Sequence, residues 1–463
     1  MKNQAQLSDK DKQFRDFSLH DNMWRVVLYV GFPLALYQSL TQLFKIFDSM
    51  MAAHISATAV STVAYLSQIN LMLSALGGGL AVGASIKISE AYGSGDFQLV
   101  KKRVSTLFAM CAILGLTLLV VLVPFTPQFL RLAKTPEEFI AGGTQYFILE
   151  LFGMVISFFN NVYIAIERAR GNSKRILNLN MVVIGLKLAL TALFVYVLNC
   201  GINMISVATI ISQTFLLAAA CKNLNQKDNA FGFSLAAISL KPEVTRPMIA
   251  LSIPVIVEKV AFSFGKVIVN SMSTIYTPLT VGALGISNNI GGFTTMPQNG
   301  FQEGGSAIIS QNLGAGEPKR ALKAFQCVLV IDAAIGVFFM TLSLVFIRQI
   351  SWLFAGSDEE FLQMIASIYR YEALGAVPLG INAAVLSLLY GFGKTRLTLV
   401  INFCRVFLFR IPVLWFLQNF TDLGSISVGI VMGISNILTG AAASLICIWE
   451  IRKICKEYQI TFF

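Results

Sequence analysis

Residues 83–96 read GASIKISEAYGSGD, and residues 304–317 read GGSAIISQNLGAGE. The two segments are identical at 6 of their 14 positions, and they lie 221 residues apart in the chain. One such match could arise by chance, so the question is whether the same shift aligns other parts of the sequence.

It does so over most of both halves, in the same order. A shift of 221 aligns Pro33 with Pro254 and Lys45 with Lys266; a shift of 222 aligns Glu150 with Glu372, Gly153 with Gly375 and Asn160 with Asn382; and a shift of 220 aligns GNSK (171–174) with GFGK (391–394). Ordered matches of this kind indicate that the chain contains two copies of one structural unit.

The composition is that of a membrane protein. The chain has 463 residues, of which 56% are hydrophobic and only 13% are charged, and its mean hydropathy is +0.70. Soluble domains carry about 25% charged residues. A helix needs about 20 apolar residues to cross a bilayer, and segments of that length lie at 26–51, 57–86, 104–124, 143–167, 175–199, 201–223, 247–276, 280–311, 322–347, 362–390, 396–418 and 423–450.

The fold class that follows is an all-α integral membrane protein with twelve transmembrane helices in two six-helix repeats. Six is even, so both repeats enter the membrane in the same orientation, and parallel repeats of this kind are typical of two-lobed transporters. The expected organisation is an N-terminal tail (1–23), an N-lobe (24–224), a linker (225–246), a C-lobe (247–452) and a C-terminal tail (453–463).

The distribution of basic residues predicts the orientation. Of 35 Lys and Arg residues, 25 fall in the tails and in alternate loops, 3 fall in the opposite loops and 7 fall within the spans. This asymmetry places both termini in the cytoplasm, and the protein is expected in the cytoplasmic (inner) membrane as a multi-pass protein. The net charge of +11 is therefore carried by loops. The sequence has no basic patch interleaved with aromatic residues, so nucleic-acid binding is not expected.

Enzyme and metal sites are not predicted. The seven cysteines are dispersed and lack any CxxC pair, and the two histidines lie in unrelated places. Such cysteines are typical of small buried hydrophobic residues. No cofactor is expected, and the expected partners are a small organic substrate and membrane lipid, with the chain acting as a monomer.

A polar stripe interrupts the first span. Tyr37, Thr41, Lys45 and Asp48 are spaced 4, 4 and 3 residues apart, so they share one helix face, flanked by Gln38 and Gln42. This face cannot contact lipid, where unsatisfied polar groups cost several kcal/mol each. It is predicted to line a substrate cavity, with Asp48 binding the coupling ion. The alternative is that Lys45 and Asp48 only neutralise each other.

Other intramembrane polar residues extend the predicted site. Glu258, one turn after Pro254, is a second candidate for ion coupling. Further cavity candidates are Asn160, Asn180, Lys187, Lys266 and Asn289, although amide side chains can equally join helices to one another. Pro33 and Pro254 each lie inside the first span of a repeat, where proline removes a backbone hydrogen bond, and both are predicted hinges.

From about residue 24 to 450 the chain resembles the multidrug and toxic compound extrusion (MATE) transporters. The resemblance depends on the twelve spans, on Pro33 followed by Asp48, and on the motif G-[ASG]-S-x-x-[IV]-S-x-x-x-G-x-G-[DE] after spans 2 and 8. It implies a secondary antiporter that exports organic compounds in exchange for H⁺ or Na⁺ by rocking of two lobes. It also implies that Asp48 couples to the ion and that the helix carrying Pro33 bends.

The chain departs from the family where many members bind Na⁺. Ala189 and Leu193 stand where those members carry Asn and Asp, and Phe262 stands where others carry a glutamate. These differences favour H⁺ and leave Na⁺ open. The lysines at 45, 187 and 266 disfavour a cationic substrate by Coulomb repulsion, so a flippase for an anionic lipid-linked oligosaccharide, or transport of another anionic substrate, is the alternative function.

Overall fold

The computed structural model describes residues 6–53, 57–133, 135, 137–225, 229–356 and 358–460, excluding the side chains of residues 45–53, 57–64, 138 and 278. In these ranges the chain is helical, and the only β-type pairing is a single bridge between Gln6 and Asn229.

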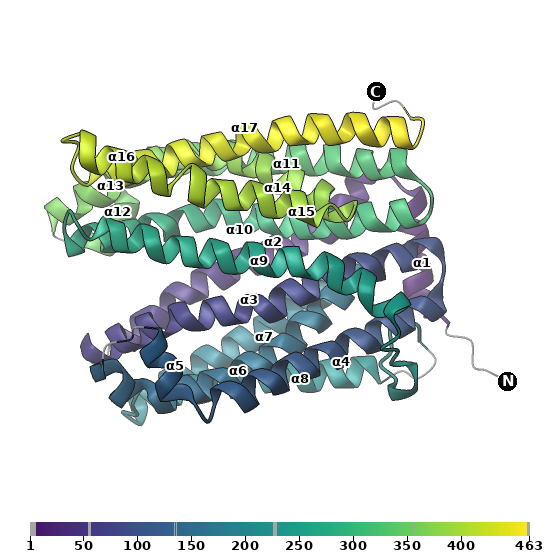
Figure 1. Cartoon of the computed structure of the whole chain (residues 1–463), viewed down its shortest axis with the longest axis horizontal. Coiled ribbons are helices and arrows are strands. Elements are labelled where there is room, and N and C mark those ends of the chain that lie inside the picture. Colours follow the sequence, from purple (N-terminus) through teal and green to yellow (C-terminus); the bar gives the residue numbers. More distant parts are fainter. Residues whose placement is uncertain are drawn as a thin grey trace. The chain divides into compact units, whose positions relative to one another are not determined.

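Figure 1 labels the helices in chain order. Those of the first repeat and the segment before it are α1 (Asp9–His20), α2 (Met23–Ala53), α3 (Ala57–Ser94), α4 (Phe97–Leu122), α5 (Thr126–Leu132), α6 (Glu137–Ala169), α7 (Ser173–Ala192), η1 (Leu193–Val197) and α8 (Asn203–Leu224). After η2 (Leu235–Ala237), the second repeat contains α9 (Pro242–Ser273), α10 (Pro278–Gly314), α11 (Pro318–Val345), α12 (Ile347–Ala355), α13 (Glu359–Ala373), α14 (Ala376–Gly391), α15 (Thr395–Phe403), η3 (Cys404–Leu408), α16 (Ile411–Phe420) and α17 (Ile426–Glu457).

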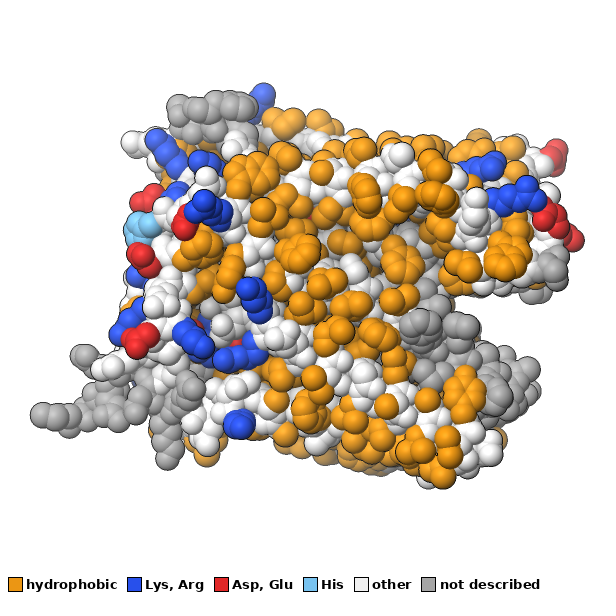
Figure 2. Space-filling model, turned by 180° about the vertical axis from the view of Figure 1, so that it is seen from behind, with side chains coloured by type: hydrophobic (Ala, Val, Ile, Leu, Met, Phe, Trp, Pro, Cys, Tyr) orange, Lys and Arg blue, Asp and Glu red, His pale blue; other side chains and the backbone are white. Residues whose placement is uncertain are grey.

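The helices confirm a membrane protein with twelve spans. Among the described residues, 10 helices are long and apolar enough to cross a bilayer, and α13 with α14 forms an eleventh span that is bent by 47°. The twelfth is α10, which is 37 residues long and rich in Gly, Asn and Gln. Hydrophobic side chains cover the sides of the helices in Figure 2, whereas Lys and Arg gather mostly toward one end of them. Side chains such as Val120 and Leu445 are 70% exposed, as lipid-facing residues are.

The repeated motif forms the same turn twice. Gly95 and Gly316 adopt positive φ angles of 84° and 78°, a conformation that favours glycine because a Cβ would clash. Asp96 and Glu317 then stand at the N-caps of α4 and α11. The motif therefore ends one long helix and starts the next at the same place in each repeat.

One predicted alignment is wrong. In the turn after α6, Gly171 donates to the oxygen of Arg168 and Asn172 donates to that of Glu167. The same pattern recurs after α14, where Gly393 and Lys394 are the donors. The turns therefore align with a shift of 222, not 220, because the glycine with positive φ, 77° in one turn and 70° in the other, fixes the register.

Contacts divide the chain into two compact units that do not coincide with the sequence halves. Unit 1 contains Met1–Asp16 and Leu43–Val260, and unit 2 contains Phe17–Gln42 and Ala261–Phe463. The chain passes from one unit to the other inside three helices, α1, α2 and α9. The lobe limits at residues 24, 224, 247 and 452 describe the repeat, and they stay a prediction.

Glycines explain why the first helix of each repeat is divided between the two units. In unit 1, a Cβ on Gly79 of α3 would lie 2.8 Å from the backbone of Ile256 in α9. In unit 2, a Cβ on Gly300 of α10 would lie 2.4 Å from the backbone of Ala35 in α2. A shift of 221 relates these two contacts, so each repeat's second helix packs closely against the other repeat's first helix.

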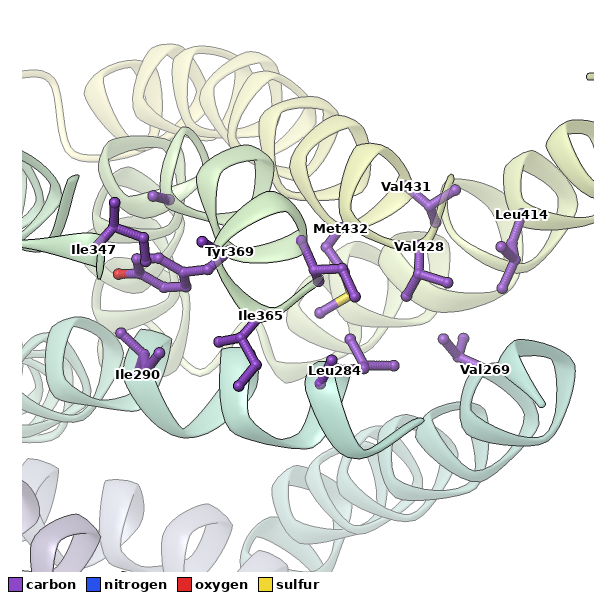
Figure 3. Packing of buried hydrophobic residues seen from close by; sticks show 14 residues of the cluster. Val269, Leu284, Ile290, Ile347, Ile365, Tyr369, Leu414, Val428, Val431 and Met432 are labelled. Atoms are coloured by element: carbon purple, nitrogen blue, oxygen red, sulfur yellow. The ribbon is translucent and has the colours of Figure 1, made fainter. Parts of the chain in front are cut away.

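The core of unit 2 joins several helices around one apolar cluster. It includes Leu284 of α10, Ile365 and Tyr369 of α13, Leu414 of α16 and Met432 of α17, all nearly inaccessible to solvent. Figure 3 shows these side chains directed toward one another from the surrounding helices. This cluster holds α13 against α17, and both helices contribute to the polar site described below.

Helix α1 precedes the spans and is tightly held in unit 1. Asp11, 1% exposed, accepts hydrogen bonds from Nε and Nη2 of Arg170 at 2.9 and 2.8 Å. Glu167 forms a second ion pair with Arg170 at 3.3 Å. Burial alone would lower the pKa of Arg170, but the Glu167 and Asp11 carboxylates together raise it. The tail thus contains a helix fixed by a buried charge cluster.

The C-terminal end of α1 makes its contacts in unit 2. Ser18 Oγ donates to Gln311 Oε1 at 2.9 Å. Arg320 donates to the backbone oxygens of Ser18 and Asp21 at 3.2 and 2.9 Å. The helix is therefore bonded at both of its ends.

Candidate functional site

The described part of the first-span stripe lies on α2 in unit 2. Tyr37 and Gln38 are partly exposed, and Thr41 donates to the backbone oxygen of Tyr37 at 2.9 Å. Gln42 is only 5% exposed, and its Nε2 donates to the backbone oxygen and Oδ1 of Asn289 at 3.2 and 3.4 Å. The structure thus joins two of the predicted cavity residues, Gln42 and Asn289, by a hydrogen bond between α2 and α10.

The predicted coupling residues are described to different extents. Lys45 and Asp48 belong to the helical backbone of α2, but their side chains lie outside the described residues. Glu258 is described, and it is 7% exposed on α9. Pro33 and Pro254 both lie inside continuous helices. Their roles in coupling and bending stay predictions.

Amide side chains in the first repeat join helices. Asn160 Nδ2 of α6 donates to the backbone oxygen and Oε1 of Gln213 in α8 at 2.9 and 2.7 Å. Asn180 Nδ2 donates within α7 to the Ile176 oxygen at 2.8 Å, and Lys187 is partly exposed on the same helix. The contact of Asn160 is of the helix-joining type that was the alternative to a cavity lining, whereas that of Asn180 stays within its own helix.

Equivalent glutamates stand at the polar centre of each repeat. In the first, Glu150 accepts from Asn70 Nδ2 at 2.8 Å and from Ser206 Oγ at 2.7 Å. In the second, Glu372 accepts a hydrogen bond from Ser287 Oγ. A shift of 221 places Gly291 at the position of Asn70, and a Cβ there would lie 3.1 Å from Glu372 Oε1. The second glutamate therefore lacks the amide partner of the first.

The backbone around Glu372 is irregular. Glu372 lies three residues before Gly375, at which the span made of α13 and α14 bends by 47°, whereas the equivalent helix α6 is continuous. In span 11, η3 is a π-helical turn in which Phe409 donates to the Cys404 oxygen at 2.9 Å. Single π turns inside α-helices are frequent at functional sites.

Three basic residues surround this glutamate, and we call Lys266, Arg405, Arg410 and Glu372 the basic cluster. All three cations lie within electrostatic range of the Glu372 carboxylate. Arg410 is 2% exposed, and it donates to Ser435 Oγ at 3.1 Å and to Asn436 Oδ1 at 3.2 Å. The Arg405 guanidinium donates to the same Asn436 oxygen at 3.0 Å. One asparagine thus aligns both arginines.

An aromatic ring lies beside two of these cations. Lys266 Nζ is 5.1 Å from the centroid of the Phe262 ring, and Arg405 Cζ is 5.2 Å from it. Cations at this distance are attracted by the negative potential of a ring face. The site in the second repeat therefore combines positive charge with an aromatic surface.

The predicted site included Lys266 but omitted Arg405, Arg410 and Glu372. All three are charged residues inside predicted spans, and the signal that could have singled out the arginines is their presence together in RVFLFR, residues 405–410. Arginine inside an apolar span is costly and often functional.

Comparison with known proteins identifies the family. The model of the family MatE matches residues 33–193 and again residues 254–416. Both matches begin at a proline, Pro33 and Pro254, and their starts are separated by the 221 residues of the internal repeat.

Related proteins match over nearly the whole chain. The probable multidrug resistance protein YoeA of Bacillus subtilis is 23% identical over 95% of this chain and 96% of its own length. The probable multidrug resistance protein NorM of Thermotoga maritima is 21% identical, covering 91% and 92%. An FAD transporter of Shewanella oneidensis is 29% identical, but over only 33% of this chain and 32% of its own.

Solved structures share the fold. A MATE crystal structure in complex with MaL6 superimposes with a TM-score of 0.91 at 19% identity, covering 97% of this chain and all of the other. An outward-facing multidrug resistance MATE transporter gives a TM-score of 0.89 at 18% identity, covering 97% and 99%. Since the MatE family model covers more than half of the chain, in both repeats, this protein belongs to the MatE family of multi-pass membrane transporters.

Proposed function

We propose that the protein is a secondary active antiporter that exports small organic compounds across the cytoplasmic membrane in exchange for H⁺ or Na⁺. The observation that carries this proposal is the presence of ionisable side chains inside spans of a MatE-family fold, with Glu258 buried and Glu150 and Glu372 half-buried. Ionisable residues in membrane spans are expensive, and they commonly bind ions or substrates.

The orientation follows from the loops. The excess of Lys and Arg in the tails and alternate loops supports a cytoplasmic location for both termini. Export is then movement away from the end of the helices at which α1 lies.

Ion coupling is assigned to the first helix of each repeat. Asp48 on α2 and Glu258 on α9 would bind the ion, and Pro33 and Pro254 would allow these helices to bend. Because α2 and α9 each contribute to both compact units, a bend in either helix would act on both. Rocking of the two lobes would then expose the substrate site to each side of the membrane in turn.

The relatives support export of organic compounds. YoeA and NorM are described as multidrug resistance proteins, which favours export over the flipping of a lipid-linked oligosaccharide. The relative that transports FAD is an argument against restricting the substrate to cations.

Transport in proteoliposomes tests the proposal. A pH gradient and a Na⁺ gradient are imposed separately on vesicles loaded with an organic dye, and wild type is compared with Asp48→Asn and Glu258→Gln. We expect one gradient to drive uptake or release in wild type, and we expect the substitutions to abolish that dependence. Transport by Asp48→Asn and Glu258→Gln at the wild-type rate under both gradients would contradict the coupling assignment.

A further inference from the structure

Asp332 is a fully buried acid in the middle of α11. Its side chain is 0% exposed, and neither carboxyl oxygen has a hydrogen-bond partner among the described residues. Helix α11 packs mainly on α10 and α14, and also on α12 and α13. The structure describes every side chain of these helices except that of Pro278, which has no hydrogen-bonding group. The neighbouring helices therefore provide the carboxyl group with no donor.

The carboxyl group lies where α10, α11 and α14 approach one another closely inside unit 2. One turn before Asp332, Val328 Cγ2 of α11 would lie 2.7 Å from a Cβ on Gly305 of α10, and Ser387 Oγ of α14 would lie 3.3 Å from that Cβ. At the level of Asp332, a Cβ on Gly380 of α14 would lie 2.5 Å from the Asp332 backbone oxygen. This packing explains why the acid is inaccessible to solvent.

Gln298 of α10 joins the turn that contains Asp332 to the bend in span 10. It is 1% exposed, and its Nε2 donates to the backbone oxygens of Asp332 and Ala376 at 3.0 and 3.1 Å. Ala376 is the first residue of α14, directly after the 47° bend between α13 and α14. Gln298 Oε1 has no hydrogen-bond partner in the described part of the chain. The side chains of Gln298 and Asp332 thus contain three buried oxygens that accept no hydrogen bond from it.

A proton supplies what this region lacks. An ionised carboxylate that is buried without a partner costs far more free energy than a neutral polar group, and a group in that position takes up a proton instead. The neutral carboxyl group also has an O–H donor, whereas the carboxylate has none. The geometry around Asp332 therefore favours the protonated form.

Neighbouring charges do not offset the cost of ionisation. Glu303, the one charged residue of α10, lies about 160° around the helix axis from Gly305, so it faces away from α11. Tyr369 of α13 bonds to Ser343, which is about 16 Å along α11 from the buried acid. The other titratable side chains of these helices, none of them within electrostatic range of the acid, are Lys319, Arg320, Lys323, Cys327, Arg348, Glu359, Glu360, Arg370, Tyr371, Glu372 and Tyr390.

The first repeat has an apolar version of the same place. Three aligned pairs of positions differ together between the repeats: Gly77 and Gln298, Cys111 and Asp332, and Phe158 and Gly380. A Cβ on Gly77 would lie 2.1 Å from the Phe158 ring, and a Cβ on Gly380 would lie 2.6 Å from Gln298 Nε2. The ring of the first repeat and the amide of the second thus fill equivalent space from opposite helices. The repeated fold does not require the acid, and the acid is not an isolated substitution.

We propose that Asp332 is a proton-binding site of the second repeat, which holds a proton in this conformation and exchanges it with water when the bend between α13 and α14 changes. On release, the O–H bond of the carboxyl group breaks, the proton passes to water and the carboxylate remains. Gln298 connects the two events, because it bonds both to the turn of the acid and to the residue after the bend. This inference rests on the proposed transport function and adds H⁺ coupling at a residue outside the first helix of each repeat.

Infrared spectroscopy of the full-length protein in detergent tests whether the proton is bound. Wild type at neutral pH is compared with Asp332→Asn, which has nearly the same shape but cannot ionise, and with Asp422→Asn, which replaces an exposed aspartate. Exposed aspartates are ionised at neutral pH. We therefore expect the carbonyl band of a protonated carboxylic acid, shifted in D₂O, to be weaker in Asp332→Asn and unchanged in Asp422→Asn. Equal bands in wild type and Asp332→Asn would refute the proton site.

The rate at which this band shifts in D₂O tests the route of exchange. Gln298→Met removes both hydrogen bonds of the amide, and the control Gln418→Met removes the bond of Gln418 to the Met272 backbone oxygen, between α16 and α9. We expect exchange to be about tenfold faster in Gln298→Met, because the lost bonds oppose opening, and to be unchanged in the control. Equal rates in the two variants would contradict the route through the bend.

Transport in proteoliposomes tests whether the proton is coupled. The membrane potential is held at zero, a pH gradient is imposed, and the steady-state ratio of dye concentrations across the membrane is measured. Loss of one coupled proton lowers this ratio by about tenfold for each unit of the pH gradient, since one unit corresponds to about 1.4 kcal/mol. We expect that loss in Asp332→Asn and none in Asp422→Asn. Asp332→Cys, with the residue of the first repeat, replaces Asp332→Asn should the latter not fold.

The measurements distinguish failure of this inference from failure of the transport function. Equal dye ratios in wild type and Asp332→Asn would refute coupling through Asp332. Loss of the protonated-acid band on addition of Na⁺ at constant pH would show a Na⁺ site and refute the proton site. A band that depends on Asp332, in a wild-type protein that moves no dye under either gradient, would uphold proton binding and refute the transport function.

Discussion

At the scale of single residues, Asp332 shows how far the repeats have diverged. A shift of 221 aligns it with Cys111, and both side chains are 0% exposed. Neither carboxyl oxygen of Asp332 has a hydrogen-bond partner among the described residues, although its backbone oxygen accepts from Gln298 at 3.0 Å. The second repeat thus carries a buried acid where the first carries a small apolar residue.

Asp332→Cys is therefore expected to stabilise the protein. Removing a buried polar group without a partner relieves a penalty of about 1–3 kcal/mol, and cysteine has nearly the same volume. Thermal unfolding in detergent should show a higher Tm, and the reverse change, Cys111→Asp, should lower it. A lower Tm for Asp332→Cys would mean that the carboxyl makes a stabilising contact.

The buried pairing of Arg170 predicts the opposite effect. Arg170→Met leaves Asp11 and Glu167, 1% and 0% exposed, without their main partner, and unpaired buried charges cost about 3–5 kcal/mol. Arg131→Met is the control, because its pair with Glu137 is exposed and such pairs contribute about 0–1 kcal/mol. Equal Tm values for the two variants would show that α1 contributes little to stability.

The charged residues of the site could be recognised in the sequence, but their grouping could not. On a regular α-helix, residues five apart such as Arg405 and Arg410 lie about 140° apart around the axis, on different faces. The π turn from Cys404 to Leu408 brings positions i and i+5 close together, so both arginines reach Asn436. Nothing in the local sequence reveals that turn.

At the scale of helices, neighbouring glycines of α3 provide a direct comparison. A Cβ on Gly79 would lie 2.6 Å from Cγ1 of Ile256, whereas a Cβ on Gly78 would meet nothing within 4 Å. Gly79→Ala should destabilise by about 1–3 kcal/mol through overpacking, and Gly78→Ala should stabilise by roughly 0.5–1 kcal/mol through helix propensity. Opposite shifts in Tm would confirm the close packing of α3 on α9, and equal shifts would contradict it.

The spans and their helical type follow from the sequence because apolar runs of the right length are unambiguous in lipid. Their interruptions do not. The bend after α13 depends on Gly375, where a Cβ would lie 2.4 Å from Asn436 Cβ of another helix. The equivalent Gly153 lies in the continuous α6, so the same residue type produces a bend in only one repeat.

At the scale of the whole molecule, the division into units did not follow from the repeat, because it depends on which helix each glycine contacts. Unit 1 extends to Val260, so it includes the first part of α9, which belongs to the second repeat. Residues 1–227 alone should therefore be unstable, and co-expression with residues 228–463 should restore a folded protein. Size-exclusion chromatography of tagged fragments checks this, and a stable, monomeric N-terminal fragment would contradict it.

The exchange of first helices bears on how such a chain could arise. In the present chain, the first part of each repeat's first helix packs in the unit formed mainly by the other repeat. A polypeptide with only one repeat would have no second repeat against which that part could pack. It could complete its unit only by pairing with a second copy, each lending that segment to the other, as in domain swapping. Gene duplication would then have fused an obligate homodimer into one chain and freed one half to acquire its own charges.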